Sequence, residues 1–401
     1  MLIMKTQSFL FIILFLSALF VSCTDSNKDE TTNTDAIAVD INNSESQSFE
    51  SVFKITDLIA FQNSENLPIK PIKRILKNQE NYWILTSNQI LLLDLRGNML
   101  QSVSSEGNGP GEFQSLDDIR WNDFSKTIEV LDKSSGKLIR YTTSGEFQDE
   151  WKNPYLNLAT SFYPKGDQYF IYGGTFFNGD GDRAVLVSGK SGEKIAGYSK
   201  LGKERNYLNV VNNDTFYEFG GEIEFSFSDN DTIYTLNQED TKAKYIFDFG
   251  EFKTPKEFFD RDFENIMEFR NEASANNYIS IFATQSTDQH IFLFLTQGAK
   301  FFPTIFDRSS GKVKIIDNWS TDFGDEFSKL SSYLTYAPIG SDDESLYFAI
   351  DPYAIKSEID KLTDNPSLPD FLEQNPYINQ IFEDFETYEN PYILKLSILD
   401  I

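Results

Sequence analysis

The stretch IEVLDKSSGKLIRY, residues 128–141, contains the unit that decides the fold. In this unit an apolar strand ends in a polar residue, a glycine follows four positions later, and a second strand begins. Glycine adopts the positive φ that a tight hairpin requires, and the polar side chain can accept hydrogen bonds from the turn amides. The unit therefore predicts a β-hairpin. Further copies are ILLLDLRGNMLQSV (90–103), AVLVSGKSGEKIAGY (184–198), TIFDRSSGKVKII (304–316) and a degraded TIYTLNQEDTKAKYIFDF (232–249).

The turn position and the surrounding strands extend this pattern over the chain. In three copies the glycine lies four residues after the polar residue, at Asp132–Gly136, Ser188–Gly192 and Asp307–Gly311. Each hairpin is preceded by a further strand that ends near the repeat. These strands are NYWILTS (81–87), DDIRWN (117–122), QYFIYGG (168–174), IEFSFSD (223–229), HIFLFLT (290–296) and SLYFAID (345–351). Short strands repeated in this way predict an all-β fold, a β-propeller with six blades of about four strands.

Both ends of the predicted propeller read as strands. FESVFKITDLIAF (49–61) opens it and NPYILKLSILDI (390–401) ends it. We expect these two segments to pair in one blade, because such pairing removes an open sheet edge.

Two segments predict short helical insertions between the strands. Residues 254–272 begin with Thr254 as the expected N-cap, Pro255 at the first helical position and Glu257 completing a capping box. Residues 353–386 combine apolar residues at helical spacing with Asn-Pro and Leu-Pro breaks. The predicted fold class is thus a six-bladed β-propeller with short helical insertions.

The segment GNGPGEF (107–113), followed by DDI and by a strand ending in VLD, resembles the six-bladed β-propeller lipoproteins, relatives of NHL-repeat propellers. The resemblance is sharpest over residues 82–147, and the terminal NPYILKL is similar to the closing strand of that family. It implies the propeller fold and an exported location. Most members of the family have no assigned reaction, so the resemblance implies no particular chemistry.

The first 22 residues, MLIMKTQSFLFIILFLSALFVS, have the layout of a secretory signal. Lys5 supplies the positive start, and Cys23, the only cysteine, follows Ser22 directly. FVSC resembles the bacterial lipobox, with Phe20 where that motif usually has Leu. We therefore expect lipidation at Cys23 in an outer-membrane lipoprotein that faces the periplasm or the cell surface. A plain signal or a membrane anchor is the alternative, although the apolar run falls short of the ~20 residues that a spanning helix needs.

Composition sets the domain plan and excludes several kinds of site. Residues 23–48 carry few large apolar side chains and are expected to form a disordered tether, which leaves 49–401 for the propeller. The net charge of −27 at pH 7 disfavours nucleic-acid binding. One cysteine permits no disulfide within the chain, and one histidine permits no multi-histidine metal site.

Two groups of acidic residues are candidate ligand sites. Asp117 and Asp118 precede a predicted inner strand, where they could rim the central channel and hold Ca²⁺ or act as acid and base. Adjacent strand residues point to opposite faces, however, so the two need not cooperate. In FNGDGDRAV (177–185), Asn178, Asp180 and Asp182 alternate like the start of a Ca²⁺ loop. A polar hairpin loop is the competing interpretation, because Arg183 stands where an EF-hand has glycine.

The remaining conspicuous residues have simpler interpretations. GNGPGEF lacks the Lys-Ser/Thr of a phosphate-binding loop and is expected to connect two blades. His290 begins a strand, and the four tryptophans, Trp83, Trp121, Trp151 and Trp319, are expected in blade packing. No GxSxG or HExxH motif occurs.

The leading functional hypothesis is a lipid-anchored module, more a binder than an enzyme, that holds a ligand or a protein at the outer membrane. No cofactor is predicted, and Ca²⁺ is the metal that the acidic loops would suit. One alternative is an NHL-like hydrolase or lyase with a Ca²⁺-type metal in the channel. Another is an accessory protein that binds polysaccharide. Fold alone decides none of these.

Overall fold

The computed structural model describes residues 35–62, 68–174, 181–200, 215–238, 240–335, 338–385 and 390–401. The chain divides into two units, of which the second is Asp35–Ile401. The predicted signal peptide (1–22) and the predicted lipidation site Cys23 lie outside the described residues. All described residues belong to the second unit.

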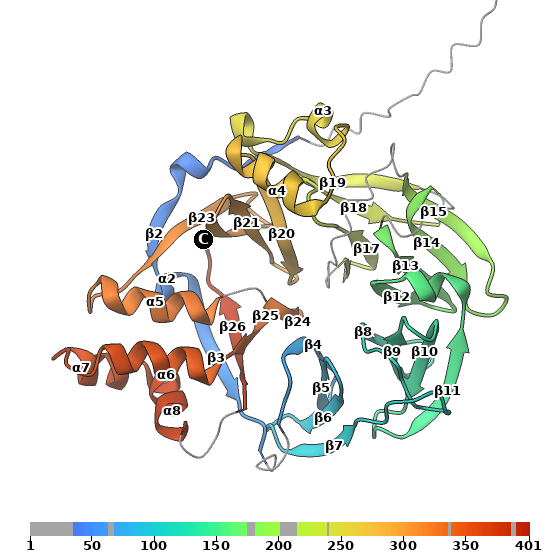
Figure 1. The fold of residues 1–401 in the computed structure, drawn as a ribbon, viewed down its shortest axis with the longest axis horizontal. Coiled ribbons are helices and arrows are strands. Elements are labelled where there is room, and N and C mark those ends of the chain that lie inside the picture. Colours follow the sequence, from blue (N-terminus) through green and yellow to red (C-terminus); the bar gives the residue numbers. More distant parts are fainter. Residues whose placement is uncertain are drawn as a thin grey trace, which may run out of the picture. The chain divides into compact units, whose positions relative to one another are not determined.

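Within the described residues the strands form six sheets of four or five strands each, a propeller-like all-β fold. Figure 1 shows the sheets set around a common centre, with β4, β8, β12, β20 and β24 nearest to it. Three sheets are antiparallel meanders, each made of consecutive strands. They consist of β4 (Ile72–Lys77), β5 (Asn81–Thr86), β6 (Ile90–Asp94) and β7 (Met99–Val103); β8 (Asp118–Asn122), β9 (Thr127–Asp132), β10 (Lys137–Tyr141) and β11 (Phe147–Lys152); and β12 (Ser161–Lys165), β13 (Gln168–Tyr172), β14 (Asp182–Ser188) and β15 (Lys194–Lys200).

The next two sheets each add one strand from the start of the unit to such a meander. They consist of β16 (Phe216–Phe219), β17 (Glu222–Phe225), β18 (Thr232–Leu236) and β19 (Thr241–Asp248) with β1 (Ile37–Ala38); and of β20 (Ile279–Ser286), β21 (His290–Gln297), β22 (Lys300–Asp307) and β23 (Val313–Ser320) with β2 (Glu45–Ser48). Both added strands run parallel to their outer neighbours, β19 and β23.

The last sheet joins both ends of the chain. It contains β24 (Pro338–Ser341), β25 (Ser345–Ile350), β26 (Tyr392–Ile398) and β3 (Phe53–Ile59). β3 and β26 pair antiparallel, with Leu58 opposite Leu394. The prediction that the two end segments pair in one sheet is confirmed, although the first four residues of the N-terminal segment form the short helix α2 (Phe49–Val52) instead of strand.

The predicted hairpin turns are confirmed in detail. Gly136, Gly192 and Gly311 have φ values of 62°, 75° and 70°. The polar residue before each turn accepts a turn amide: Asp132 Oδ1 from Ser135 N at 3.1 Å, Ser188 Oγ from Ser191 N at 3.1 Å and Asp307 Oδ1 from Ser309 N at 2.7 Å. The local chemistry of the repeat thus fixes the hairpins.

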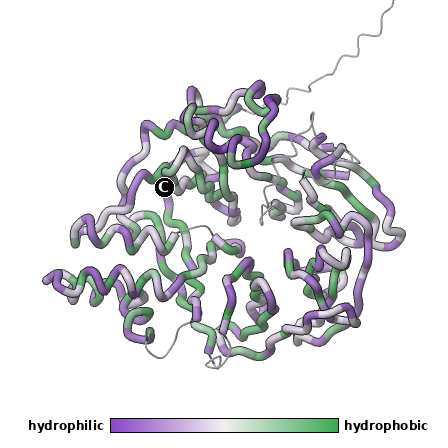
Figure 2. The backbone as a smooth tube through the Cα atoms, viewed as in Figure 1, coloured by the Kyte–Doolittle hydropathy of each residue, from purple (hydrophilic) through white to green (hydrophobic). Residues whose placement is uncertain are grey.

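Apolar side chains pack between neighbouring sheets and beneath the helices. Figure 2 marks the hydrophobic residues along the backbone in green. Trp83 and Trp319 are buried, and Trp151 stacks on Tyr169 with ring centroids 4.7 Å apart. Trp121 packs against the same cluster as Trp83. All four tryptophans therefore contribute to packing, as expected.

The structure differs from the predicted disordered tether over residues 35–48. Strands β1 and β2 lie in this stretch, and the side chains of Val39 and Ile41 are buried. Ile37, Val39 and Ile41 alternate with small or polar residues, which is the pattern of a half-buried strand. The segment covers the outer edges of two sheets, and this pairing stabilises an order that its low apolar content alone does not predict.

Helices occur mainly where insertions were predicted. They are α3 (Lys256–Phe259), α4 (Ile266–Ala275), α5 (Asp325–Leu334), α6 (Pro352–Lys361), α7 (Leu368–Gln374) and α8 (Pro376–Asp384), with 3-10 turns at Ile41–Asn43, Pro154–Leu158 and Gly250–Phe252. α5 was not predicted. Among the described residues, none of these helices is long and apolar enough to cross a bilayer.

The predicted capping box at Thr254 is wrong. Pro255, with ψ of 148°, occupies the N-cap of α3 and supplies no side-chain hydrogen bond. The longer helix α4 begins at Ile266, where the Asn265 side chain accepts the amides of Met267 and Glu268. The helix therefore starts at Lys256, one residue later than the pattern indicated, because the backbone of Pro255 is extended.

Candidate functional site

Asp118 lies at the start of an inner strand but serves to join sheets. Its carboxylate is buried and pairs with Arg74 Nε of β4 at 2.8 Å. It also accepts the Ser161 hydroxyl at 2.8 Å and the Phe162 amide at 3.1 Å, both on β12. One carboxylate thus binds groups of three consecutive sheets, and its oxygens are already occupied by these partners.

Asp117 points elsewhere. Its Oδ2 accepts the Ser115 hydroxyl at 2.5 Å and the Lys133 amide at 3.0 Å, which fixes the turn after β9. The two adjacent aspartates therefore make separate sets of contacts.

The predicted Ca²⁺-like loop is only partly within the described residues. Asn178 and Asp180 lie outside them. Asp182 is buried at the start of β14, where Lys194 Nζ lies 2.8 Å and Lys200 Nζ 2.6 Å from its carboxylate oxygens. In the part of the chain that the structure describes, no three His, Cys, Asp or Glu side chains form a cluster suited to a metal.

His290 and the GNGPGEF segment have structural environments. His290 is buried, its Nε2 lies 4.0 Å from Asp307 Oδ2, and burial lowers its pKa. In the glycine-rich segment, Glu112 Oε2 accepts the Gly109 amide at 2.7 Å. Gly111 N donates to Glu150 on β11 at 2.9 Å, so the segment connects two neighbouring sheets.

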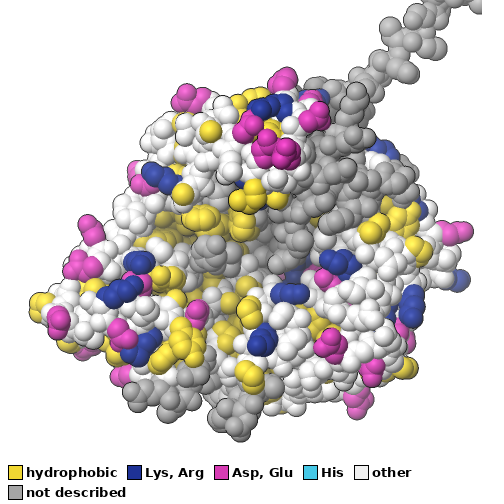
Figure 3. Space-filling model, in the orientation of Figure 1, with side chains coloured by type: hydrophobic (Ala, Val, Ile, Leu, Met, Phe, Trp, Pro, Cys, Tyr) yellow, Lys and Arg dark blue, Asp and Glu magenta, His cyan; other side chains and the backbone are white. Residues whose placement is uncertain are grey.

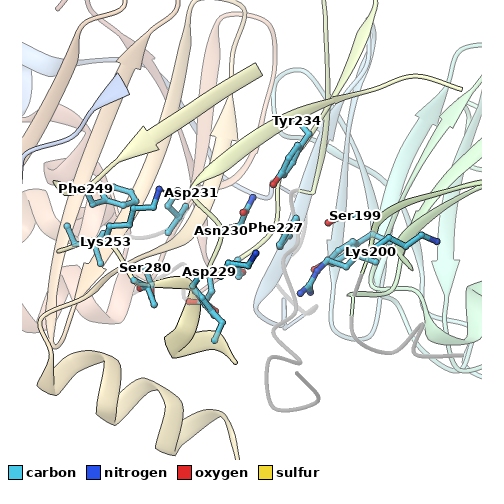
Figure 4. Close-up of a pocket in the computed structure, with 18 residues that line it drawn as sticks. Ser199, Lys200, Phe227, Asp229, Asn230, Asp231, Tyr234, Phe249, Lys253 and Ser280 are labelled. Carbon is cyan, nitrogen blue, oxygen red and sulfur yellow. Dashed lines mark ion pairs between the residues drawn. The ribbon is translucent and has the colours of Figure 1, made fainter. Parts of the chain in front are cut away.

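A different region has the character of a binding site, and the sequence motifs did not indicate it. A pocket of about 350 Å³ lies among the sheets β12–β15 and β16–β19, strand β20 and the segment leading into α3; we call it the inter-sheet pocket. Figure 4 shows Ser199 and Lys200 on one side, Phe249 and Lys253 on the other, and Phe227, Asp229 and Tyr234 between them. Its lining consists of Tyr172, Arg183, Ser199, Lys200, Phe227, Ser228, Asp229, Asn230, Asp231, Tyr234, Phe249, Lys253, Thr254, Lys256, Phe259, Ile279, Ser280 and Ile281.

The loop between β17 and β18 contributes the most unusual groups. Within the described residues, the buried atoms Ser228 Oγ and Asp229 Oδ2 have no hydrogen-bond partner. Asp229 also has a φ of 57°, which an aspartate adopts only at some cost. Buried polar atoms are nearly always paired, so two orphaned atoms on adjacent residues of one pocket require an explanation.

The electrostatic surroundings of Asp229 agree with its burial. Desolvation raises the pKa of its carboxyl, while the Arg270 charge and the Ser280 hydroxyl oppose this effect more weakly. Burial also raises the pKa of the neighbouring Tyr172 to about 12. The nearby Asp231 is ion-paired, because Lys253 Nζ lies 2.6 Å from its Oδ2.

Aromatic rings form one wall of the pocket. The Tyr172 and Phe227 rings are nearly parallel, with centroids 6.4 Å apart and planes 23° from each other. Phe227 and Tyr234 follow at 6.3 Å and 5°. The Arg183 guanidinium lies over the Phe227 ring, 4.9 Å from its centroid. The three rings are therefore nearly parallel, and they line the same pocket as the orphaned polar atoms.

The sequence contained one faint signal for this site. The residues SDND (228–231) are four consecutive polar side chains after a strand. IEFSFSD was predicted as strand through residue 229, whereas β17 ends at Phe225. The remaining lining residues come from segments far apart in the sequence, so no local motif could assemble them.

Comparisons with known proteins agree with the fold. The chain is similar to a solved structure from Bacteroides fragilis NCTC 9343 at 14% identity and a TM-score of 0.72, over 91% of this chain and 100% of that one. It is also similar to a member of the DUF4221 family from Bacteroides vulgatus at 13% identity and a TM-score of 0.51, over 87% and 98% of the two chains. No curated protein matches the sequence. A family model described as "Domain of unknown function (DUF4934)" matches residues 32–397, and the chain therefore belongs to that family.

Proposed function

We propose that this protein is an exported, lipid-anchored six-bladed β-propeller that binds a small polar ligand in the inter-sheet pocket. The observation that carries the binding role is the pair of orphaned atoms, Ser228 Oγ and Asp229 Oδ2. A buried polar group without a partner costs about 1–3 kcal/mol of stability. A ligand that bonds to both atoms explains why the chain keeps them.

The size and lining of the pocket support this role. Its volume of about 350 Å³ falls in the range of small-molecule sites, and it combines aromatic walls with a few polar groups. Figure 3 shows acidic and basic side chains interspersed over one face of the molecule, with no large patch of one sign that would indicate a polyelectrolyte partner.

Polar links at the junctions between sheets support a closed ring of six blades. Arg74–Asp118, Asp118–Phe162 N and Tyr163–Glu218 connect the first four sheets in succession. The remaining junctions are joined by Arg308–Glu224 at 2.7 Å, Asp288 N–Asp343 O at 2.9 Å and Lys77–Asp342 at 3.2 Å. Together with the pairing of β3 and β26, these links leave no junction without a contact.

The exported, lipid-anchored location is supported by the sequence. Cys23 directly follows the apolar run of residues 9–21 and Ser22. Mass spectrometry of the N-terminal peptide from membranes is expected to show a lipid-modified Cys23 as the first residue. A retained Met1, or an unmodified Cys23, contradicts the anchor but leaves the binding role untouched.

A screen by thermal shift tests the binding role. Wild type and Asp229→Asn are heated with amino acids, nucleosides, saccharides and small carboxylic acids, and Asp123→Asn serves as a control at an exposed site. At least one compound is expected to raise the Tm of wild type and of the control but not of Asp229→Asn. Equal shifts in all three proteins, or none in any, contradict the proposal.

One observation favours acid–base catalysis as a second candidate function. The pocket holds two carboxyls in different surroundings: burial raises the pKa of Asp229, whereas Asp231 forms an ion pair with Lys253. Two carboxyls held in different environments of one pocket are the kind of pair that general acid and base catalysis uses. Chromatographic detection of product after incubation with compounds that bind tests this candidate, and intact ligand after prolonged incubation rules it out.

A further inference from the structure

We propose that the ligand of the inter-sheet pocket is a neutral carbohydrate, of one or two sugar rings. The inference rests on the proposed function, since it names the chemical class of the ligand in that same pocket. Three features of the lining carry it: the aromatic wall, the orphaned polar atoms and the pairing of the charges.

The aromatic wall suits the C–H face of a sugar ring. Phe227 lies between Tyr172 and Tyr234, and the planes of the three rings differ by 23° and 5° at the two steps. Nearly parallel aromatic rings offer apolar surface, and Tyr172 and Tyr234 each carry a hydroxyl beside it. A pyranose has apolar C–H groups on its faces and hydroxyls around its edge, and it matches both parts of such a surface.

The orphaned atoms suit the hydroxyls at the edge of a sugar. Asp229 Oδ2 can accept a hydrogen bond, and the Ser228 hydroxyl can both donate and accept one. Asn230 Nδ2 already donates to Thr232 O at 2.6 Å, which orients its carbonyl oxygen as a further acceptor. Adjacent acceptors and a hydroxyl match neighbouring sugar hydroxyls, each of which donates one hydrogen bond and accepts others.

Charge pairing distinguishes a neutral ligand from an anion. The pocket is lined by Arg183 and three lysines, which alone would indicate an anionic ligand. Lys200, however, pairs with Asp182 at 2.6 Å and Lys253 with Asp231 at 2.6 Å. The Arg183 guanidinium is stacked on Phe227. Three of these four cations are therefore engaged within the protein, Lys256 being the fourth, and an anionic ligand at Lys200 or Lys253 would have to compete with carboxylates already in place.

The volume limits the size of the ligand. About 350 Å³ is near the lower end of the roughly 300–1,000 Å³ that small-molecule sites occupy. The pocket therefore accommodates one or two sugar rings, and a longer chain would have to extend beyond the described lining.

Titration calorimetry on the full mature protein tests the inference. The probes are neutral mono- and disaccharides built from glucose, galactose, mannose and N-acetylglucosamine, with glucuronic acid and glucosamine as charged counterparts. At least one neutral saccharide is expected to bind, and at least tenfold more tightly than its charged counterpart. Tyr234→Ala and Ser228→Ala are each expected to weaken binding by tenfold or more. Tyr353→Ala, which removes a tyrosine ring exposed on α6, is the matched control and is expected to bind like wild type.

Each contrary outcome overturns a definite part of the account. If a charged sugar binds more tightly than its neutral counterpart, the inference that the ligand is neutral is wrong. Equal binding by wild type and by Tyr234→Ala and Ser228→Ala, with near-UV circular dichroism showing all three folded, overturns the placement in the pocket. If an amino acid or nucleoside raises the Tm of wild type but not of Asp229→Asn, and no saccharide binds, the ligand class is wrong but the proposed function stands. Absence of every Asp229-dependent ligand overturns both.

Discussion

At the scale of single residues, Asp229 carries the strongest evidence for function. It combines a buried unpaired oxygen, a positive φ and a raised pKa in one side chain. Each of these properties lowers the stability of the fold, and binding sites are where proteins retain such costs. Arg270 on α4 and Tyr172 on β13 are the ionisable groups that interact with it.

Asp229→Asn is therefore expected to stabilise the free protein. Asparagine removes the cost of burying a charge and tolerates a positive φ. The ordinary pKa of the aspartate is 3.8 and folding raises it. Below pH 3.8 the carboxyl is protonated in both the folded and the unfolded protein, so folding buries no charge. The free-energy cost of burying the charge grows as the pH rises from 3.8 to the pKa in the folded protein and is constant above it. By urea denaturation the variant should gain about 1 kcal/mol at pH 7. A gain independent of pH, or a loss, contradicts this explanation.

Asp118 illustrates the opposite kind of buried aspartate, one that is fully partnered. Asp118→Ala removes the carboxylate shared by Arg74, Ser161 and Phe162 N and leaves a buried arginine without it. The free energy of unfolding should fall by about 3–5 kcal/mol. Asp123→Ala, which breaks only the exposed pair with Lys126, should change it by less than about 1 kcal/mol. Similar losses for the two variants would show that the inner network does not hold the sheets together.

At the scale of elements, the pairing of β3 with β26 joins the two ends of the described unit. Lys54 lies directly opposite Ser397 in the register. Opposed Cα atoms in an antiparallel pair lie about 4.5–5.5 Å apart, within reach of a disulfide.

A cysteine pair therefore tests this register. In a Cys23→Ser background, Lys54→Cys with Ser397→Cys should form a disulfide on oxidation and raise the Tm. Thr56→Cys with Ser397→Cys is the control, because diagonal positions lie about 7–8 Å apart and do not crosslink readily. Non-reducing mass spectrometry reports the bond. Crosslinking of the control alone would mean that the strands pair in a shifted register.

Secondary-structure elements could be predicted from the sequence where the residues that determine them lie close together in the chain. The Asp-to-Gly hairpins follow from turn chemistry within five residues, and Asp132, Gly136, Asp307 and Gly311 behave as expected. Strand β1 was not predicted, because its order comes from pairing with β19 across the domain. The inter-sheet pocket was missed for the same reason: Tyr172, Asp229 and Lys253 come together only after three sheets and an insertion have assembled.

At the scale of the whole molecule, the acidic composition and the single cysteine each have a physical explanation. Six sheets that pack face to face supply a large apolar core, so stability does not depend on cysteine crosslinks. The net charge of −27 favours solubility over binding to a polyanion, and on the face that Figure 3 shows acidic and basic side chains are interspersed.

The most direct test of the binding role is a crystal structure of the mature protein soaked with the neutral saccharide that binds most tightly. The predicted result is a sugar in the inter-sheet pocket, with hydroxyls within hydrogen-bond distance of Ser228 Oγ and Asp229 Oδ2 and a ring face against Phe227 or Tyr234. A saccharide bound elsewhere, with ordered waters pairing both orphaned atoms in an unchanged pocket, would contradict it.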